Sequence, residues 1–115
     1  MHELGVVFHI IDEVELVAVT NHVRTISRVV LELGEVSTVI PSYLTDCWMW
    51  ARAKHDMLKD CDLDIETIQA LSYCDDCKKT YPTVRYGKTC PGCGGSNTWL
   101  ERGSEFMIKE IEVEE

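Results

Sequence analysis

The sequence has few basic residues and no long uncharged apolar segment. Lys and Arg number 11 against 20 Asp and Glu among 115 residues, so the net charge is −9. This balance argues against a phosphate-binding surface as the main function, and therefore against a nucleic-acid partner. No apolar stretch is long enough to span a bilayer, and the first residues lack the basic segment of an export signal. We therefore expect a cytoplasmic protein without a membrane partner.

The sequence also lacks the patterns that usually carry catalysis. No nucleophile–base arrangement, paired acid site or phosphate-binding loop stands out, which argues against an enzyme. Internal repeats and low-complexity segments are absent as well. The length suits one domain, or one domain with a small inserted module.

Four of the six cysteines form two Cys-x-x-Cys pairs, and these pairs carry the clearest chemistry in the chain. Cys74 and Cys77 form the first pair, and Cys90 and Cys93 form the second. Two such pairs at this separation supply four thiolates that can converge on one ion, and a closed tetrahedral sulfur set suits Zn²⁺. The intervening segment has too few apolar residues for a core of its own, so we expect it to fold largely on its metal. Iron in the same thiolate site, two disulfides and unrelated thiols are the alternatives.

The rest of the chain predicts a small α+β fold. Apolar residues at spacings of three and four, from Leu4 through Phe8 to Ala18, predict a helix over about 4–20. Pro41 is well placed as the first residue of a second helix. Segments rich in β-branched residues or alternating in polarity predict strands at 24–33, 62–67, 97–102 and 106–113. The alternation of the last strand slips between Ile108 and Ile111, which a β-bulge would explain.

The order of these elements predicts how the chain is divided. The last strand must return to the first part of the chain to bury its apolar residues, so the cysteine segment reads as an insertion. We expect a base domain formed by residues 1–68 and 98–115, with a small mixed β-sheet and two helices. A zinc-ribbon-like module would occupy residues 69–97.

The first three residues form a second candidate metal site. The amine of Met1, the amide nitrogen of His2 and the Nδ1 atom of its imidazole can bind one ion, closing a five-membered and a six-membered chelate ring. Glu3 can supply a fourth donor through its amide or carboxylate. A flat, nitrogen-rich donor set of this kind selects Ni²⁺ or Cu²⁺ in square-planar geometry. The alternative is that His2 has no metal role.

Four segments, taken together and in this order, resemble the HypA/HybF family of nickel-insertion accessory proteins. They are Met1-His2-Glu3-Leu4, Val30-Leu-Glu-Leu-Gly34-Glu35, the two Cys-x-x-Cys pairs with Pro91 and Gly94, and Ile108-Lys-Glu-Ile-Glu-Val-Glu114. The resemblance implies a nickel metallochaperone for [NiFe]-hydrogenase maturation. It implies a transient nickel site at Met1, His2 and Glu3, and a structural zinc site at Cys74, Cys77, Cys90 and Cys93.

The resemblance also implies partners. Nickel would pass to the hydrogenase large subunit with the help of a HypB-type GTPase, urease maturation factors are possible further partners, and a homodimer is possible. Among the departures from the family, the segment from Cys47 to Asp56 is unlike its usual aliphatic helix. No histidine follows His55, so zinc should be bound by thiolates alone. A zinc-ribbon adaptor that binds protein or nucleic acid through the local basic residues Lys78, Lys79, Arg85 and Lys88, with no nickel role, is the alternative function.

Overall fold

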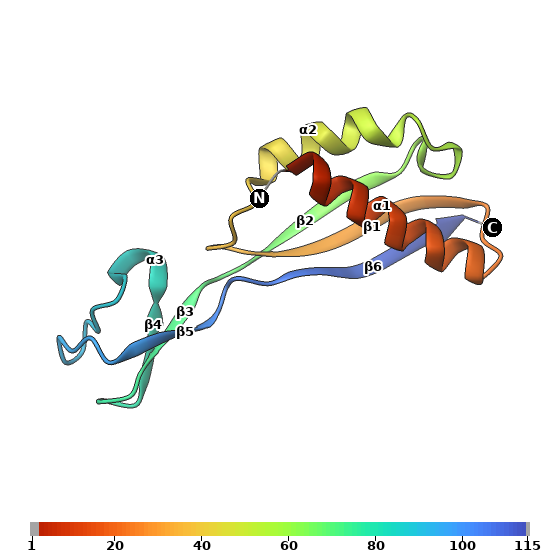
Figure 1. Cartoon of the computed structure of the whole chain (residues 1–115). Helices are drawn as coiled ribbons and strands as arrows, with labels where there is room; N and C mark the ends of the chain where they lie inside the picture. Colours follow the sequence, from red (N-terminus) through yellow and green to blue (C-terminus); the bar gives the residue numbers. More distant parts are fainter. Residues whose placement is uncertain (1–2, 115) are drawn as a thin grey trace. The chain divides into compact units, whose positions relative to one another are not determined.

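The computed structural model describes residues 3–114, which form two compact units (Figure 1). The base unit consists of the chain up to Glu32, Thr38–Glu66 and the residues from Met107. The ribbon unit consists of Leu33–Ser37 and Thr67–Phe106. The ribbon unit is longer than the predicted module, because a strand expected in the base, β5 (Thr98–Arg102), pairs with another strand of the ribbon.

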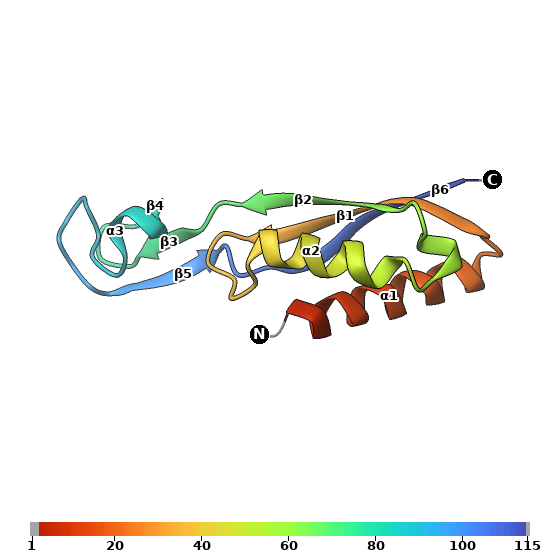
Figure 2. The same cartoon turned by 90° about the horizontal axis from the view of Figure 1, so that it is seen from above.

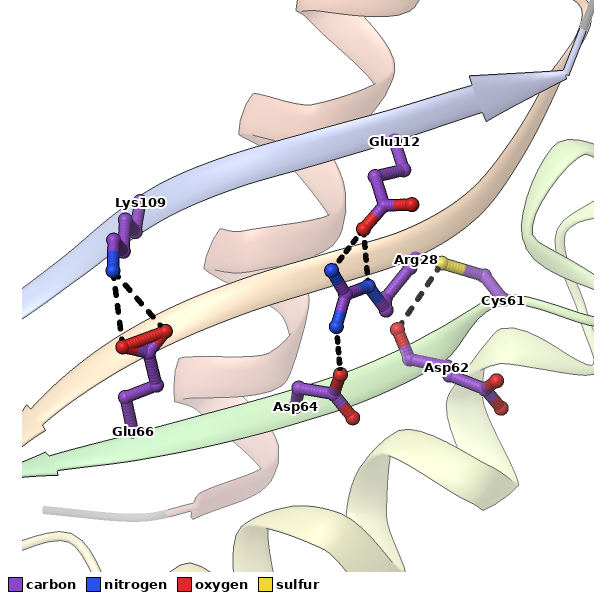
Figure 3. A network of polar contacts seen from close by, with 7 residues as sticks. All are labelled: Arg28, Cys61, Asp62, Asp64, Glu66, Lys109 and Glu112. Carbon is purple, nitrogen blue, oxygen red and sulfur yellow. Dashed lines mark hydrogen bonds and ion pairs between the residues drawn. The ribbon is translucent and has the colours of Figure 1, made fainter.

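The base is built on a three-stranded sheet. β1 (Thr25–Gly34) is its central strand, between β2 (Asp62–Ile68) and β6 (Phe106–Glu114). β1 and β2 point the same way and β6 points the opposite way, so the sheet is mixed (Figure 3). The helices α1 (Glu3–Thr20) and α2 (Pro41–Arg52) lie on one face of this sheet (Figure 2). The predicted α+β fold, with two helices on a small mixed sheet, is confirmed.

The stripe of α1 that faces the core is wider than its sequence pattern predicts. Its buried residues are Val6, Val7, Ile10, Ile11, Val14 and Ala18. Phe8, which the pattern placed in the stripe, is 43% exposed, so that assignment is wrong. Valine and isoleucine at neighbouring positions broaden the buried face of the helix, which includes Val6 and Ile10 but not Phe8.

α2 begins at Pro41, as predicted, because proline has the backbone angle of a first helical residue and needs no amide donor there. Leu44, Trp48 and Ala51 are buried on the side of the helix that faces the core. The indole Nε1 of Trp48 donates a hydrogen bond to the carbonyl oxygen of Cys61 (2.9 Å). Between α2 and β2 the chain forms a short 3₁₀ turn, η1 (Asp56–Leu58). The Trp48 bond therefore fixes the end of this connection against the helix.

The face of the sheet away from the helices carries ion pairs (Figure 3). Arg28 on β1 lies between Asp64 on β2 and Glu112 on β6 and is bonded to both, and Lys109 bonds to Glu66 (3.0 Å). Hydrogen bonds that Arg28 donates to the Asp64 and Glu112 carboxylates raise its pKa. Lys109 and Glu112 lie on the same face although they are three positions apart along β6. Strict alternation forbids that, so the strand is irregular between them, in agreement with the slip seen in the sequence.

The ribbon unit contains a second three-stranded sheet. β3 (Leu71–Cys74) is central and pairs antiparallel with β4 (Lys79–Pro82) and with β5. A single helical turn, α3 (Thr83–Tyr86), follows β4. The sequence analysis did not predict β3, β4 or α3, because each is only four residues long and none has a repeating apolar pattern.

Three chain segments of the ribbon unit approach each other so closely that there is no room for side chains at Gly34 and Gly103. A Cβ atom on Gly34 would lie 2.0 Å from the carbonyl oxygen of Gly103, and a Cβ atom on Gly103 would lie 2.3 Å from the Cα atom of Ala70. Gly103 also has a φ of 120°, which strains any other residue. Backbone bonds from Gly34 N–H to the oxygen of Glu105 (2.8 Å) and from Val36 N–H to that of Gly103 (2.9 Å) join the segments. Glycine is therefore required at both positions.

Candidate metal centre

The ribbon unit brings together the four cysteines that the sequence analysis selected. Cys74 ends β3, Cys77 lies in the turn between β3 and β4, and Cys90 and Cys93 lie in the loop before β5. Their Sγ atoms all lie within 4.8 Å of one another. Among residues 3–114 no other group of three or more Cys, His, Asp or Glu side chains meets this condition.

The distances between the sulfur atoms fit a shared metal ion. The Sγ atoms of Cys74 and Cys93 are 3.6 Å apart, and those of Cys77 and Cys90 are 3.5 Å apart. A disulfide needs about 2.05 Å, so these cysteines are free thiols. Four sulfur atoms at about 2.3 Å from a tetrahedral Zn²⁺ ion are about 3.8 Å apart. The residues present therefore fit a closed tetrahedral site, and Zn²⁺ is the ion that such a sulfur set suits best.

Two similar turns hold the two cysteine pairs. The N–H of Lys78 donates to the carbonyl oxygen of Cys74 (2.8 Å), and that of Gly94 donates to the carbonyl oxygen of Cys90 (2.8 Å). Each donor is the fourth residue after the first cysteine of its pair, and each has a positive φ, 60° at Lys78 and 72° at Gly94. Glycine adopts this conformation without cost, whereas a lysine is strained by about 1 kcal/mol. The first turn thus adopts the metal-binding geometry despite an unfavourable residue.

Backbone N–H groups and neighbouring thiols separate the acidities of the cysteines. Burial acts against the Cys90 thiolate, but hydrogen bonds from the N–H groups of Cys93 and Gly92 and from the thiols of Cys77 and Cys74 lower its pKa to about 7. The hydrogen bond between Cys77 and Cys90, together with burial, raises the pKa of Cys77 to about 12. Cys90 therefore ionises more readily than Cys77, and a bound cation would hold all four cysteines as thiolates.

Few apolar groups surround the four sulfur atoms. The buried cluster of this region consists of Cys74, Cys90 and Tyr81, with Cys77 packed against it. The hydroxyl of Tyr81 donates to the carbonyl oxygen of Gly87 (2.8 Å). Two of the three buried residues are candidate ligands, so in the absence of a metal little apolar surface would hold this part of the chain together.

One supporting position was missed by the sequence analysis. A Cβ atom on Gly95 would lie 3.0 Å from a carboxylate oxygen of Asp76 and 3.3 Å from the sulfur of Cys93. Asp76 in turn accepts a hydrogen bond from the side chain of Asn97 (3.4 Å). Gly95 follows Gly94 directly, and this pair of glycines beside a cysteine was the signal available in the sequence.

The second candidate site lies at the start of the chain. Met1 and His2 are outside the described residues. Glu3 is the first residue of α1 and is partly exposed. A carboxylate in the first turn of a helix is favoured by the helix dipole, so Glu3 has a structural role there whether or not it binds a metal.

Two cysteines and two histidines of the base are fully or partly buried or contact neighbouring carboxylates, and none belongs to a metal cluster among residues 3–114. Cys61 is fully buried, and burial raises the pKa of its thiol to about 11. Cys47 is only partly buried. His55 on the connection after α2 contacts the carboxylate of Glu15 on α1 (3.2 Å), and His9 pairs with Glu13 on the surface of α1.

Comparison with known proteins identifies the family of this chain. Residues 1–113 match the profile of the family described as "Hydrogenase/urease nickel incorporation, metallochaperone, hypA". The chain belongs to the HypA family. This confirms the resemblance seen in the four sequence segments. No helix among residues 3–114 is long and apolar enough to cross a membrane.

Relatives of the same length support this membership. The "Hydrogenase maturation factor HypA" of Actinobacillus succinogenes is 35% identical over 114 residues, which cover 99% of this chain and 100% of that protein. The protein of the same name from Geotalea uraniireducens is 34% identical, with the same coverage. The solution structure of the Ni metallochaperone HypA from Helicobacter pylori has a TM-score of 0.71 at 29% identity and covers 98% of this chain and 97% of that one. A second solution structure of a HypA protein gives a TM-score of 0.73 at 30% identity, covering 98% of this chain and 96% of that one.

Proposed function

We propose that this protein is a nickel metallochaperone that delivers Ni(II) during the maturation of [NiFe]-hydrogenase. The observation that carries the proposal is the family match over residues 1–113, combined with four thiols arranged for one permanent ion. In this proposal the protein catalyses no reaction and works in the cytoplasm. Its partners are a HypB-type GTPase and the hydrogenase large subunit, with urease maturation factors as further candidates.

The nickel cargo binds at the first three residues. The amine of Met1 and the amide nitrogen and Nδ1 atom of His2 supply three nitrogen donors, and Glu3 supplies the fourth donor. These donors must lose protons to bind, so nickel affinity falls as pH falls through the titration range of imidazole. This dependence gives a delivery protein a site that selects its ion and still releases it.

The four cysteines of the ribbon hold Zn(II) and never exchange it during delivery. A closed tetrahedral site leaves no open position for a second ligand. Cys74, Cys77, Cys90 and Cys93 therefore maintain the fold of the ribbon, while the start of the chain carries the transient ion. One chain thus separates a structural metal from a transported one by donor chemistry.

The experiment compares untagged protein with protein that keeps extra residues before Met1, by equilibrium dialysis against Ni²⁺ followed by metal analysis. We expect the untagged protein to hold one nickel and one zinc. The extended protein and a His2→Ala variant should retain zinc and lose nickel, whereas the control His9→Ala, a surface histidine of α1, should bind both. Binding to the untagged protein should weaken as pH falls below about 6.5. Equal nickel retention by all four proteins would refute the terminal site and leave the adaptor function as the alternative.

A further inference from the structure

The two helices of the base form an open groove at the beginning of α1. Its volume is about 270 Å³, and it is lined by Leu4 of α1 and by Asp46, Cys47 and Trp50 of α2. The two helices run next to each other on the same face of the sheet (Figure 2). Apart from Asp46, the lining is apolar. The groove belongs entirely to the base, so its walls do not depend on the ribbon.

Exposed aromatic side chains lie in the groove and one helical turn from two of its lining residues. Trp50 is 55% exposed, and Tyr43, one turn before Cys47, is 56% exposed. Phe8, one turn after Leu4 on α1, is 43% exposed. Aromatic side chains that remain in water next to an apolar hollow are typical of interaction surfaces, where they contribute much of the binding energy.

The charges around the groove restrict what can occupy it. Asp46 is exposed at its edge, and Asp12 lies one turn after Phe8 on α1. Lys54 is the positive group near the groove, and its Nζ atom lies 4.4 Å from the centre of the Trp50 ring. The whole chain carries a net charge of −9. A second copy of the chain would bring the same negative charge to the groove, whereas a basic segment would be attracted to it.

We propose that this groove docks a segment of a partner protein that carries an aliphatic or aromatic anchor together with lysine or arginine. The anchor enters the hollow between Leu4 and Cys47 and packs against Trp50. The basic group pairs with Asp46. The inference goes beyond the metal chemistry and does not require it, although Leu4 is only three residues from Met1, so an occupant lies close in the chain to the proposed nickel donors.

The experiment uses the full-length zinc-loaded protein without nickel and three synthetic peptides. The first is an amphipathic helix of leucine and lysine, the second has glutamate in place of each lysine, and the third has serine in place of each leucine. Binding is measured by titration calorimetry, and occupation of the groove by protection of Cys47 from alkylation, located by mass spectrometry. Cys47 suits this purpose because Cys61 is fully buried and the other four thiols bind zinc in the proposed state.

We expect the leucine–lysine peptide to bind and to protect Cys47, and the other two peptides to bind at least about tenfold more weakly. Trp50→Ala should weaken the binding of the leucine–lysine peptide by about tenfold or more. Asp46→Asn should weaken this binding less and should make it less dependent on salt. Met49→Ala is the matched control, because Met49 is 52% exposed on the same helix and does not line the groove.

Three results would overturn the inference. The first is equal binding of the lysine–serine peptide, which would show attraction by charge alone, and the second is binding that leaves Cys47 fully reactive. The third is self-association that Trp50→Ala abolishes, because the groove would then be occupied by a second copy. The leucine–lysine peptide should bind the His2→Ala variant unchanged. This arm separates failure of the docking site from failure of the nickel site.

Discussion

The base and the ribbon differ in what is buried inside them. The base buries a continuous set of aliphatic side chains from α1, β1 and α2, together with Trp48. The buried cluster around the cysteines contains one tyrosine and two candidate metal ligands. We therefore expect the base to gain its stability mainly from apolar burial and the ribbon to depend on a bound ion. One chain of 115 residues would then use two separate sources of stability.

Removal of the metal should have the largest effect and should act on one unit only. A strong chelator, or the variant Cys90→Ser, should release one zinc and unfold the strands around the cysteines. The resonances of α1, α2 and β1 should stay dispersed, because their core contains no candidate ligand. Metal analysis and amide NMR spectra before and after chelation check this result.

Alkylation in the same experiment provides its control. Chelation should make the four ribbon thiols reactive. Cys61 should remain unreactive at about pH 8 until denaturant is added, because it is buried and its raised pKa keeps it protonated. If chelation exposed Cys61 as well, the two units would not be independent in stability.

A change in the aliphatic core should give the next largest loss of stability. This loss should affect the base and leave the ribbon and its metal unchanged. Leu44→Ala removes a fully buried side chain of α2 and should lower the free energy of unfolding of the base by about 2–5 kcal/mol. The zinc content should not change. Leu16→Ala is the matched control, since Leu16 is 67% exposed on α1, and should cost less than about 0.5 kcal/mol. Urea denaturation followed by tryptophan fluorescence, beside metal analysis, tests both variants.

The ion pairs on the open face of the base sheet should contribute least to the stability of the base. Arg28→Ala removes contacts to Asp64 and Glu112 that lie in solvent. We expect the Tm of the base to fall by less than about 4 °C, and the difference from the unaltered protein to shrink as salt is added. Calorimetry at low and high salt measures this. A larger loss that salt does not reduce would show that the charged face stabilises the base as much as its core does.

The sequence predicted the features with strong periodic or spacing signals. The α1 pattern, Pro41, the β-branched residues of β1 and the two Cys-x-x-Cys pairs each gave the correct element or cluster. β3 and β4 were not predicted, since four residues are too few to show alternation and their pairing depends on the turn around Cys77. Phe8 was misplaced because a helical stripe does not specify which of its edges faces the sheet. The groove could not be predicted, because it arises from the packing of α1 against α2.

The central position of β1 has a consequence for synthesis on the ribosome. Its neighbour β6 follows all the other described strands in the chain, and the ribbon combines Leu33–Ser37 with a segment that ends at Phe106. Neither unit can therefore complete its sheet before β5 and β6 have been synthesised. Nascent chains stalled before residue 106 would expose the edge of β1 where β6 belongs, and such chains are the form in which we expect this protein to be most prone to aggregation.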